Sequence, residues 1–132
     1  EEGGTYGASV GAAMQNEPEA RAMIQVYFDT NPEAADRLIK SAVESLKNLA
    51  ADGPTEEQLT RTIENAKKDL PESRISNNYW LDALMYWNRY GVDYDKEFEA
   101  AISEISSENI KTVLNEILSQ NNFIEVVMSP EE

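Results

Sequence analysis

Residues 5–29 read TYGASVGAAMQNEPEARAMIQVYFD, and their alternation points to a pair of strands. Between residues 5 and 14, every second position is small, which is typical of a strand with one face of small residues. Residues 21–29 alternate again, with apolar side chains on one face. The connection contains Pro18 and is too short for a crossover helix, so we expect the two strands to pair antiparallel.

Helical patterns follow the second strand. Asn31 and Pro32 are a capping residue and a first-turn proline, and they predict the start of a long amphipathic helix. Gly53, with a proline after it, predicts its end. Thr55 followed by Gln58 is a capping box that opens the next helix.

A helix over residues 74–90 is predicted after a possible kink at Pro71, and Gly91 suits its C-terminal cap. Two shorter amphipathic helices follow, and residues 122–128 alternate as a third strand. The expected fold is therefore α+β: an antiparallel sheet with strands at about 5–14, 21–29 and 122–128, packed with about five helices. We expect residues 1–132 to form a single domain, the later portion of a larger unit whose upstream part precedes Glu1.

The composition excludes several classes of function. The 132 residues contain no histidine and no cysteine, so thiol catalysis and a serine–histidine triad are impossible in this chain. A net charge of −14 argues against nucleic acid as a partner. No apolar run approaches the length of a membrane span. We interpret the excess of acidic residues in one of two ways: it keeps the protein soluble, or it forms an acidic surface that attracts basic peptides.

Several short motifs occur in an order that is typical of one enzyme family. They are GGTYG at 3–7, VYF followed by NP at 26–32, DGPTEEQL at 52–59, NYWL at 78–81, YGVD at 90–93 and VVMSP at 126–130. Together they resemble the C-terminal part of a pitrilysin-type (insulinase-type) zinc metallopeptidase, the inverted zincins with an HxxEH zinc motif. The resemblance covers nearly the whole chain, although no motif alone is diagnostic.

This resemblance implies a LuxS/pitrilysin-like fold and a function shared with another unit. In the family, zinc is held by an N-terminal catalytic unit, and the C-terminal half closes a peptide chamber without a metal of its own. The chain itself should hold no cofactor and no catalytic residue, because HxxEH requires histidine. Its expected partners are the N-terminal unit, in the same protein or in a partner subunit, and a peptide substrate.

The resemblance also singles out substrate-binding residues, namely Gly4, Thr5 and Tyr6. In the family, the matching tyrosine faces the substrate, and a phenol is suited to donate a hydrogen bond to a developing oxyanion. The alternative is that Tyr6 is an ordinary packing residue at the start of a strand. An arginine that often accompanies this tyrosine in the family would lie before Glu1.

Two other features have structural interpretations. The aromatic helix places Trp80, Leu84 and Trp87 on one stripe, which is predicted to be core or an interface rather than a ligand pocket. Asp93 and Asp95 lack the later glycine and glutamate of a calcium loop, so helix capping is the preferred interpretation of Asp93.

Three functions stay open at the level of sequence. The first is the non-catalytic unit of a zinc peptidase. The second is a degenerate subunit that binds peptides or assists assembly without proteolysis. The third is an unrelated helical adaptor, which would expose the stripe of Trp80 and Trp87. The compartment is not fixed, and a bacterial cytoplasm or periplasm would suit the chain.

Overall fold

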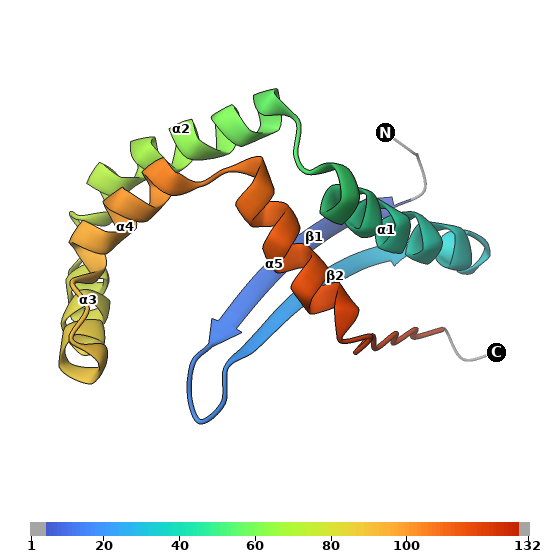
Figure 1. Cartoon of the computed structure of the whole chain (residues 1–132). Coiled ribbons are helices and arrows are strands. Elements are labelled where there is room, and N and C mark those ends of the chain that lie inside the picture. Colours follow the sequence, from blue (N-terminus) through green and yellow to red (C-terminus); the bar gives the residue numbers. More distant parts are fainter. Residues whose placement is uncertain (1–4, 130–132) are drawn as a thin grey trace. The chain divides into compact units, whose positions relative to one another are not determined.

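A computed structural model describes residues 5–129, apart from the side chain of Tyr6. The chain divides into two compact units, Glu1–Ala51 with Val113–Glu132, and Asp52–Thr112. Two strands are followed by five helices among the described residues (Figure 1). The α+β class and the five predicted helices are thereby confirmed. That residues 1–132 are one domain stays a prediction.

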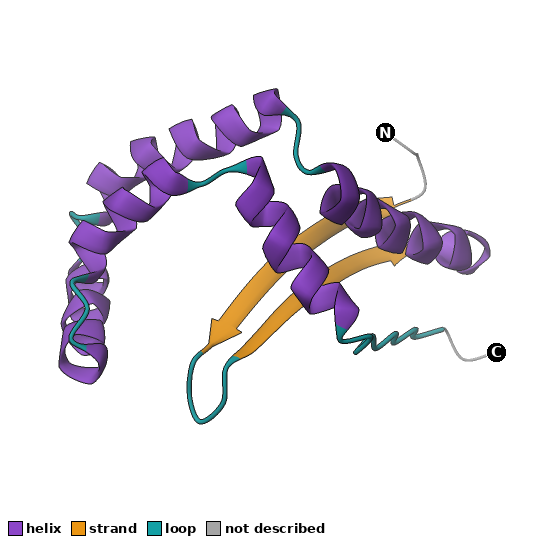
Figure 2. Cartoon of the chain, viewed as in Figure 1, coloured by secondary structure: helices purple, strands orange, loops and turns teal. Residues whose placement is uncertain are grey.

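The first unit begins with the predicted antiparallel hairpin, drawn in orange in Figure 2. Strand β1 (Thr5–Gln15) pairs with β2 (Arg21–Thr30), and the register sets Ser9 opposite Tyr27 and Val10 opposite Val26. Residues directly opposite each other share a face, so the alternation in the sequence is preserved in the sheet. The pairing is irregular between Thr5 and Gly7.

The predicted third strand is not formed. Residues 121–129 have no regular secondary structure, and the sheet consists of β1 and β2 within the part of the chain that is described. Alternation favours an extended backbone, but a strand also needs a partner for its amide and carbonyl groups. Ile124, Val126 and Met128 are accordingly exposed.

Helix α1 (Pro32–Asp52) starts and ends where the sequence predicts, and Gly53 after it has a left-handed backbone with φ of +80°. Its apolar stripe is half-buried, and Ala50 near its end is buried. Helix α5 (Ser107–Ser119) contributes the other buried side chain of the first unit, Leu114. The core of this unit is therefore thin.

The second unit contains α2 (Glu56–Ser73), α3 (Asn77–Tyr90) and α4 (Tyr94–Glu104), with α2 and α3 both contacting α4. Leu70 and Ile102 are its buried apolar side chains. The capping box of α2, the left-handed Gly91 that ends α3 and the Asp93 cap of α4 are all confirmed. Helix α2 continues through Pro71 to Ser73, so α3 begins three residues later than predicted.

Candidate functional site

The hairpin holds the residues to which the sequence assigns substrate binding. Thr5 begins β1, and its hydroxyl lies 2.7 Å from the Gly7 carbonyl oxygen and 2.8 Å from that of Asp29. The hydroxyl also accepts a hydrogen bond from the Gly7 amide at 3.1 Å. These contacts stabilise the irregular start of the hairpin, so the Thr5 hydroxyl already has partners within its own sheet.

The two other residues predicted to bind substrate, Gly4 and Tyr6, cannot be compared with the structure in the same way. Gly4 lies outside the described residues, and so does the side chain of Tyr6, although the backbone of Tyr6 belongs to β1. Their assignment to substrate binding stays a prediction. Thr5, the first described residue, begins β1 and pairs with Thr30 at the end of β2.

One face of the hairpin combines small residues with two polar groups. Gly7, Ser9 and Gly11 of β1 stand opposite Asp29, Tyr27 and Gln25 of β2. A shallow depression of about 380 Å³ lies on the hairpin, lined by Ser9, Val10, Gly11, Gln25 and Tyr27. The alternation in the sequence predicts the small residues of this face. Tyr27 and Asp29 were not predicted as a pair, although the same alternation places them on one face.

Tyr27 and Asp29 are joined by a hydrogen bond that shapes this face. The Tyr27 hydroxyl donates to Asp29 Oδ1 at 2.8 Å, and 54% of the Tyr27 side chain is exposed. The hydrogen bond to Asp29, and then the charge of that carboxylate, raise the pKa of Tyr27. The phenol of Tyr27 therefore stays protonated at neutral pH and is the donor of this hydrogen bond.

In the second unit, Arg74 after the end of α2, Tyr79 in the first turn of α3 and Asp95 in the first turn of α4 form a clasp. Arg74 donates from Nε and Nη2 to the two carboxylate oxygens of Asp95, at 2.7 and 2.9 Å, and the Tyr79 hydroxyl donates to Oδ1 at 2.6 Å. The hydrogen bonds from Arg74 and then Tyr79 lower the pKa of Asp95. Burial, and then the bond to Asp95, raise the pKa of Tyr79 to about 12. The three side chains bond to one another, so the clasp is a structural element.

Helix α3 has two faces with different surroundings. Tyr79 and Tyr86 contact the Tyr94 ring of α4, with ring centroids 6.0 and 5.2 Å apart. The stripe of Trp80, Leu84 and Trp87 is exposed, with 66% of Leu84 and 58% of Trp87 accessible. The prediction that this stripe is core is wrong, because α4 packs against the neighbouring tyrosine face. That the stripe is an interface stays a prediction.

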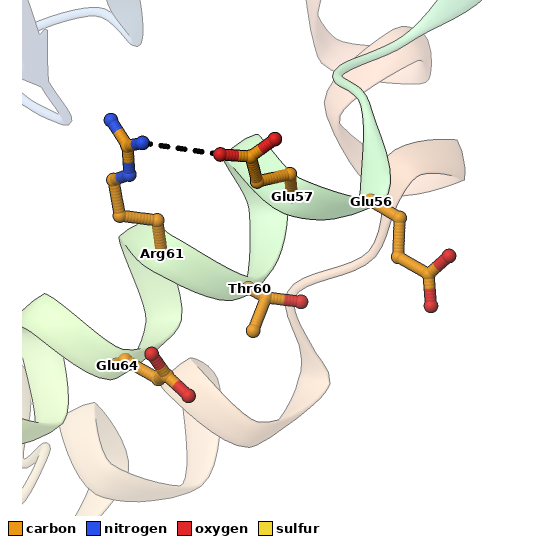
Figure 3. A pocket seen from close by; sticks show the side chains of 5 residues that line it. All are labelled: Glu56, Glu57, Thr60, Arg61 and Glu64. Atoms are coloured by element: carbon orange, nitrogen blue, oxygen red, sulfur yellow. Dashed lines mark hydrogen bonds and ion pairs between the residues drawn. The ribbon is translucent and has the colours of Figure 1, made fainter.

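A second surface depression, of about 490 Å³, lies along the first turns of α2 (Figure 3). It is lined by Glu56, Glu57, Thr60, Arg61 and Glu64, and Arg61 pairs with Glu57 at 3.2 Å. Both side chains of this pair are largely exposed, so it contributes at most about 1 kcal/mol to stability. The first-turn acids suit the positive end of the helix, and the feature is a solvated helix face.

A zinc ion does not fit the residues that are present. The sequence has no histidine or cysteine, and residues 5–129 contain no group of three acidic side chains placed to hold a metal ion. Among those same residues, no helix is both long and apolar enough to cross a membrane.

A comparison with known protein families shows to which family this chain belongs. The family model described as the Peptidase M16 inactive domain matches residues 1–66, which is half of the chain and includes the whole hairpin and α1. The chain belongs to the M16 peptidase inactive-domain family. This confirms the resemblance to the non-catalytic, C-terminal part of a pitrilysin-type peptidase and removes the unrelated helical adaptor from the possible functions.

Two relatives of this M16 inactive domain extend the comparison. A protein of Arabidopsis thaliana called "Zinc protease PQQL-like" is 29% identical over 90 residues, which is 64% of this chain and 9% of that protein. The crystal structure of the periplasmic protease PqqL from Escherichia coli matches with a TM-score of 0.66 and 19% identity. That match covers 84% of this chain and 12% of PqqL. The chain thus spans about a tenth of the length of either relative, and PqqL confirms the fold.

Proposed function

We propose that this M16 inactive domain is the non-catalytic C-terminal part of a zinc-dependent peptidase. It closes the peptide chamber and presents the segment Gly4-Thr5-Tyr6 to the substrate, opposite zinc held by an N-terminal catalytic unit. That unit belongs to the same protein or to a partner subunit. The observation that carries this proposal is the family match over residues 1–66, in a chain without histidine.

The exposed apolar surface supports a partner of this kind. Among the described residues only Ala50, Leu70, Ile102 and Leu114 are buried apolar side chains, whereas Val10 and Met14 of β1 and the tryptophans of α3 are exposed. Apolar surface of this extent is typical of a region that another unit covers. A unit that completes an enclosed chamber would cover it.

Within the chamber, we propose that this chain orients the peptide and supplies a hydrogen-bond donor to the scissile carbonyl. A tyrosine hydroxyl placed against the scissile carbonyl stabilises the negative charge that develops on its oxygen. The zinc of the other unit supplies Lewis acidity and an activated water. The chain contributes no general base, because HxxEH is absent from its sequence. Of the two compartments open to it, we propose the periplasm, where its E. coli relative PqqL resides.

The complete protein or assembly that contains these residues provides the test. Hydrolysis of a quenched fluorescent peptide library should stop on treatment with a chelator and return on addition of zinc. The chain of 132 residues alone should hydrolyse nothing at matched concentration. Hydrolysis by the complete assembly that persists without metal would remove the zinc-peptidase proposal.

A second candidate is a degenerate subunit that binds peptides or assists assembly without proteolysis. The description of the family as an inactive domain is compatible with that function as well. In that case the complete assembly should bind peptides with unchanged affinity whether or not zinc is present, and should release no cleaved product.

A further inference from the structure

Helix α3 presents an exposed apolar stripe beside the tyrosine face that packs against α4. Trp80, Leu84 and Trp87 of this stripe are 45%, 66% and 58% exposed. Leu81 is three residues before Leu84, so it lies next to it on the helix, and it is exposed as well. A group of large apolar side chains on one side of a helix is typical of an interaction surface.

Trp80 is held in place so that it offers carbon surface rather than a hydrogen-bond donor. Its indole N–H donates to the Arg74 carbonyl at 2.8 Å, and its ring meets Tyr79 edge-on, with ring centroids 5.4 Å apart. The polar atom of the indole is therefore satisfied within its own unit. The exposed part of the ring suits another apolar side chain better than a polar ligand.

The stripe carries no charge, although the chain has a net charge of −14. The charged residues of α3 are Asp82 and Arg89. Asp82 is two residues from both Trp80 and Leu84, and Arg89 is two residues from Trp87. Residues two positions apart point to different sides of a helix, so both charges lie off the stripe. Two such stripes can therefore meet without burying a charge of α3.

The order of side chains along the stripe is self-complementary. Trp80 and Trp87 are seven residues apart, which is about 10 Å along a helix, and Leu84 lies almost midway between them. When two copies of α3 run antiparallel about a two-fold axis beside Leu84, Trp80 of each copy meets Trp87 of the other. The two Leu84 side chains then meet at the axis. A two-fold contact between identical chains requires a surface of this kind.

We propose that the α3 stripe is the contact between two copies of this protein, which pair antiparallel about a two-fold axis beside Leu84. At about 250 Å² for a whole tryptophan, the exposed parts of the four apolar side chains amount to roughly 500 Å² per copy. Pairing then buries roughly 1,000 Å² in total, the lower limit for a specific interface. The second copy covers α3, and the exposed side chains of β1 are left for the catalytic unit of the proposed function.

Sedimentation velocity of the complete protein, at about 1 to 100 µM, tests this inference. We expect a dimer with a dissociation constant on the order of 10 µM, because the interface is small. Leu84→Glu places two carboxylates at the two-fold axis and should raise the dissociation constant by about 100-fold or more.

Met85→Glu is the matched control, since it makes the same kind of change at a side chain of α3 that is 59% exposed. Met85 is one residue from Leu84 and two from Trp87, so it lies off the stripe. This variant should keep the dissociation constant within about two-fold of the wild type, because it adds a charge outside the contact.

A mixture of two variants identifies the occupant of the stripe. Leu84→Lys should be monomeric by itself, for the same reason as Leu84→Glu. An equimolar mixture of the two should pair, with a dissociation constant within about ten-fold of the wild type, because opposite charges then meet at the axis. Only pairing between two copies predicts this recovery.

Four results would overturn the inference. The wild type could stay monomeric at 100 µM, the dimer could persist in Leu84→Glu, or the mixture could fail to pair. The fourth is a lower melting temperature in Leu84→Glu but not in Met85→Glu, which would show that another part of the same protein covers the stripe. Zinc-dependent hydrolysis reports on the proposed function separately, since a monomer that cleaves peptides contradicts only the pairing.

Discussion

The side-chain amide of Asn115 in α5 donates a hydrogen bond of 2.7 Å to the backbone carbonyl of Ala50 in α1. The last four carbonyls of a helix have no partner within it, and Ala50 is only 2% exposed, so water does not readily serve this carbonyl. Asn115 therefore acts as a C-terminal cap provided by another helix. It joins α1 and α5 at the two buried residues of the first unit, Ala50 and Leu114.

Replacing Asn115 should weaken this unit measurably. Asn115→Ala leaves a buried carbonyl without its donor and should lower the free energy of unfolding by about 1–3 kcal/mol. Asn115→Asp should lower it further, because a carboxylate cannot donate and repels the carbonyl oxygen. Urea denaturation measures both, with Asn122→Ala at an exposed position after α5 as the control. A change equal to that of the control would show that the cap is not needed.

Replacement of Gly53 or Gly91 by alanine should destabilise the chain by different amounts, although the two backbones are similar. Gly53 and Gly91 both have positive φ, of +80° and +67°, which costs an alanine about 1–2 kcal/mol. A Cβ at Gly53 would also overlap the Ser107 hydroxyl, whereas nothing lies within 4 Å of the same atom at Gly91. Gly53→Ala should therefore lower the melting temperature more than Gly91→Ala. Equal shifts would indicate that Ser107 rotates away freely.

The capping box at the start of α2 should contribute to the stability of the chain. The Thr55 hydroxyl accepts from the Gln58 amide at 3.2 Å, and the Gln58 side chain accepts from the Thr55 amide at 2.9 Å. Thr55→Ala should cost about 1 kcal/mol of unfolding free energy, and Thr55→Ser should cost little because serine caps equally well. Helix content at 222 nm during urea titration distinguishes these two variants.

The clasp around Asp95 predicts a pH dependence. Arg74 and Tyr79 hold the pKa of Asp95 below its usual range, so the carboxylate takes up protons less readily in the folded chain than in the unfolded one. Its contribution to stability is present above the unfolded pKa of about 4 and is lost as the pH falls through the folded pKa. The pKa of Tyr79 is raised to about 12, so its contribution is present below pH 10 and is lost as the pH rises through about 12.

Trp80 reports on this clasp, because its indole donates to the Arg74 carbonyl at 2.8 Å. In a Trp87→Phe background, Trp80 fluorescence should change in acid and again in strong alkali. Asp95→Asn, which cannot be ionised, should weaken the clasp at neutral pH and remove the acid transition. An acid transition with the same midpoint in Asp95→Asn would assign it to another group.

The sequence predicted the local features of the fold well, for reasons that can be traced to particular residues. Alternation placed Ile24 and Phe28 on one face of β2, and the signals at Thr55, Gly91 and Asp93 marked helix ends correctly. Each of these depends on residues within a few positions of one another. Short-range geometry is therefore enough to predict them.

Long-range contacts could not be predicted in the same way. Asp95 and Arg74 are 21 residues apart and Asn115 and Ala50 are 65 apart, and neither pair leaves a pattern in the sequence. The alternation at 122–128 predicted a third strand that does not form, because alternation alone does not identify a strand that would pair with it. The stripe of Trp80 and Trp87 had the spacing of a core face, yet the facing helix packs against the neighbouring tyrosines.

In the proposed function, this inactive domain contributes Tyr6 to catalysis on a zinc site held elsewhere. The most direct measurement is the single-turnover rate of peptide hydrolysis by the complete, zinc-loaded protein carrying Tyr6→Phe, at saturating peptide. Loss of one oxyanion donor should lower that rate by about 100-fold or more, while the peptide affinity stays within about two-fold of the wild type. A rate equal to that of the wild type would contradict the claim.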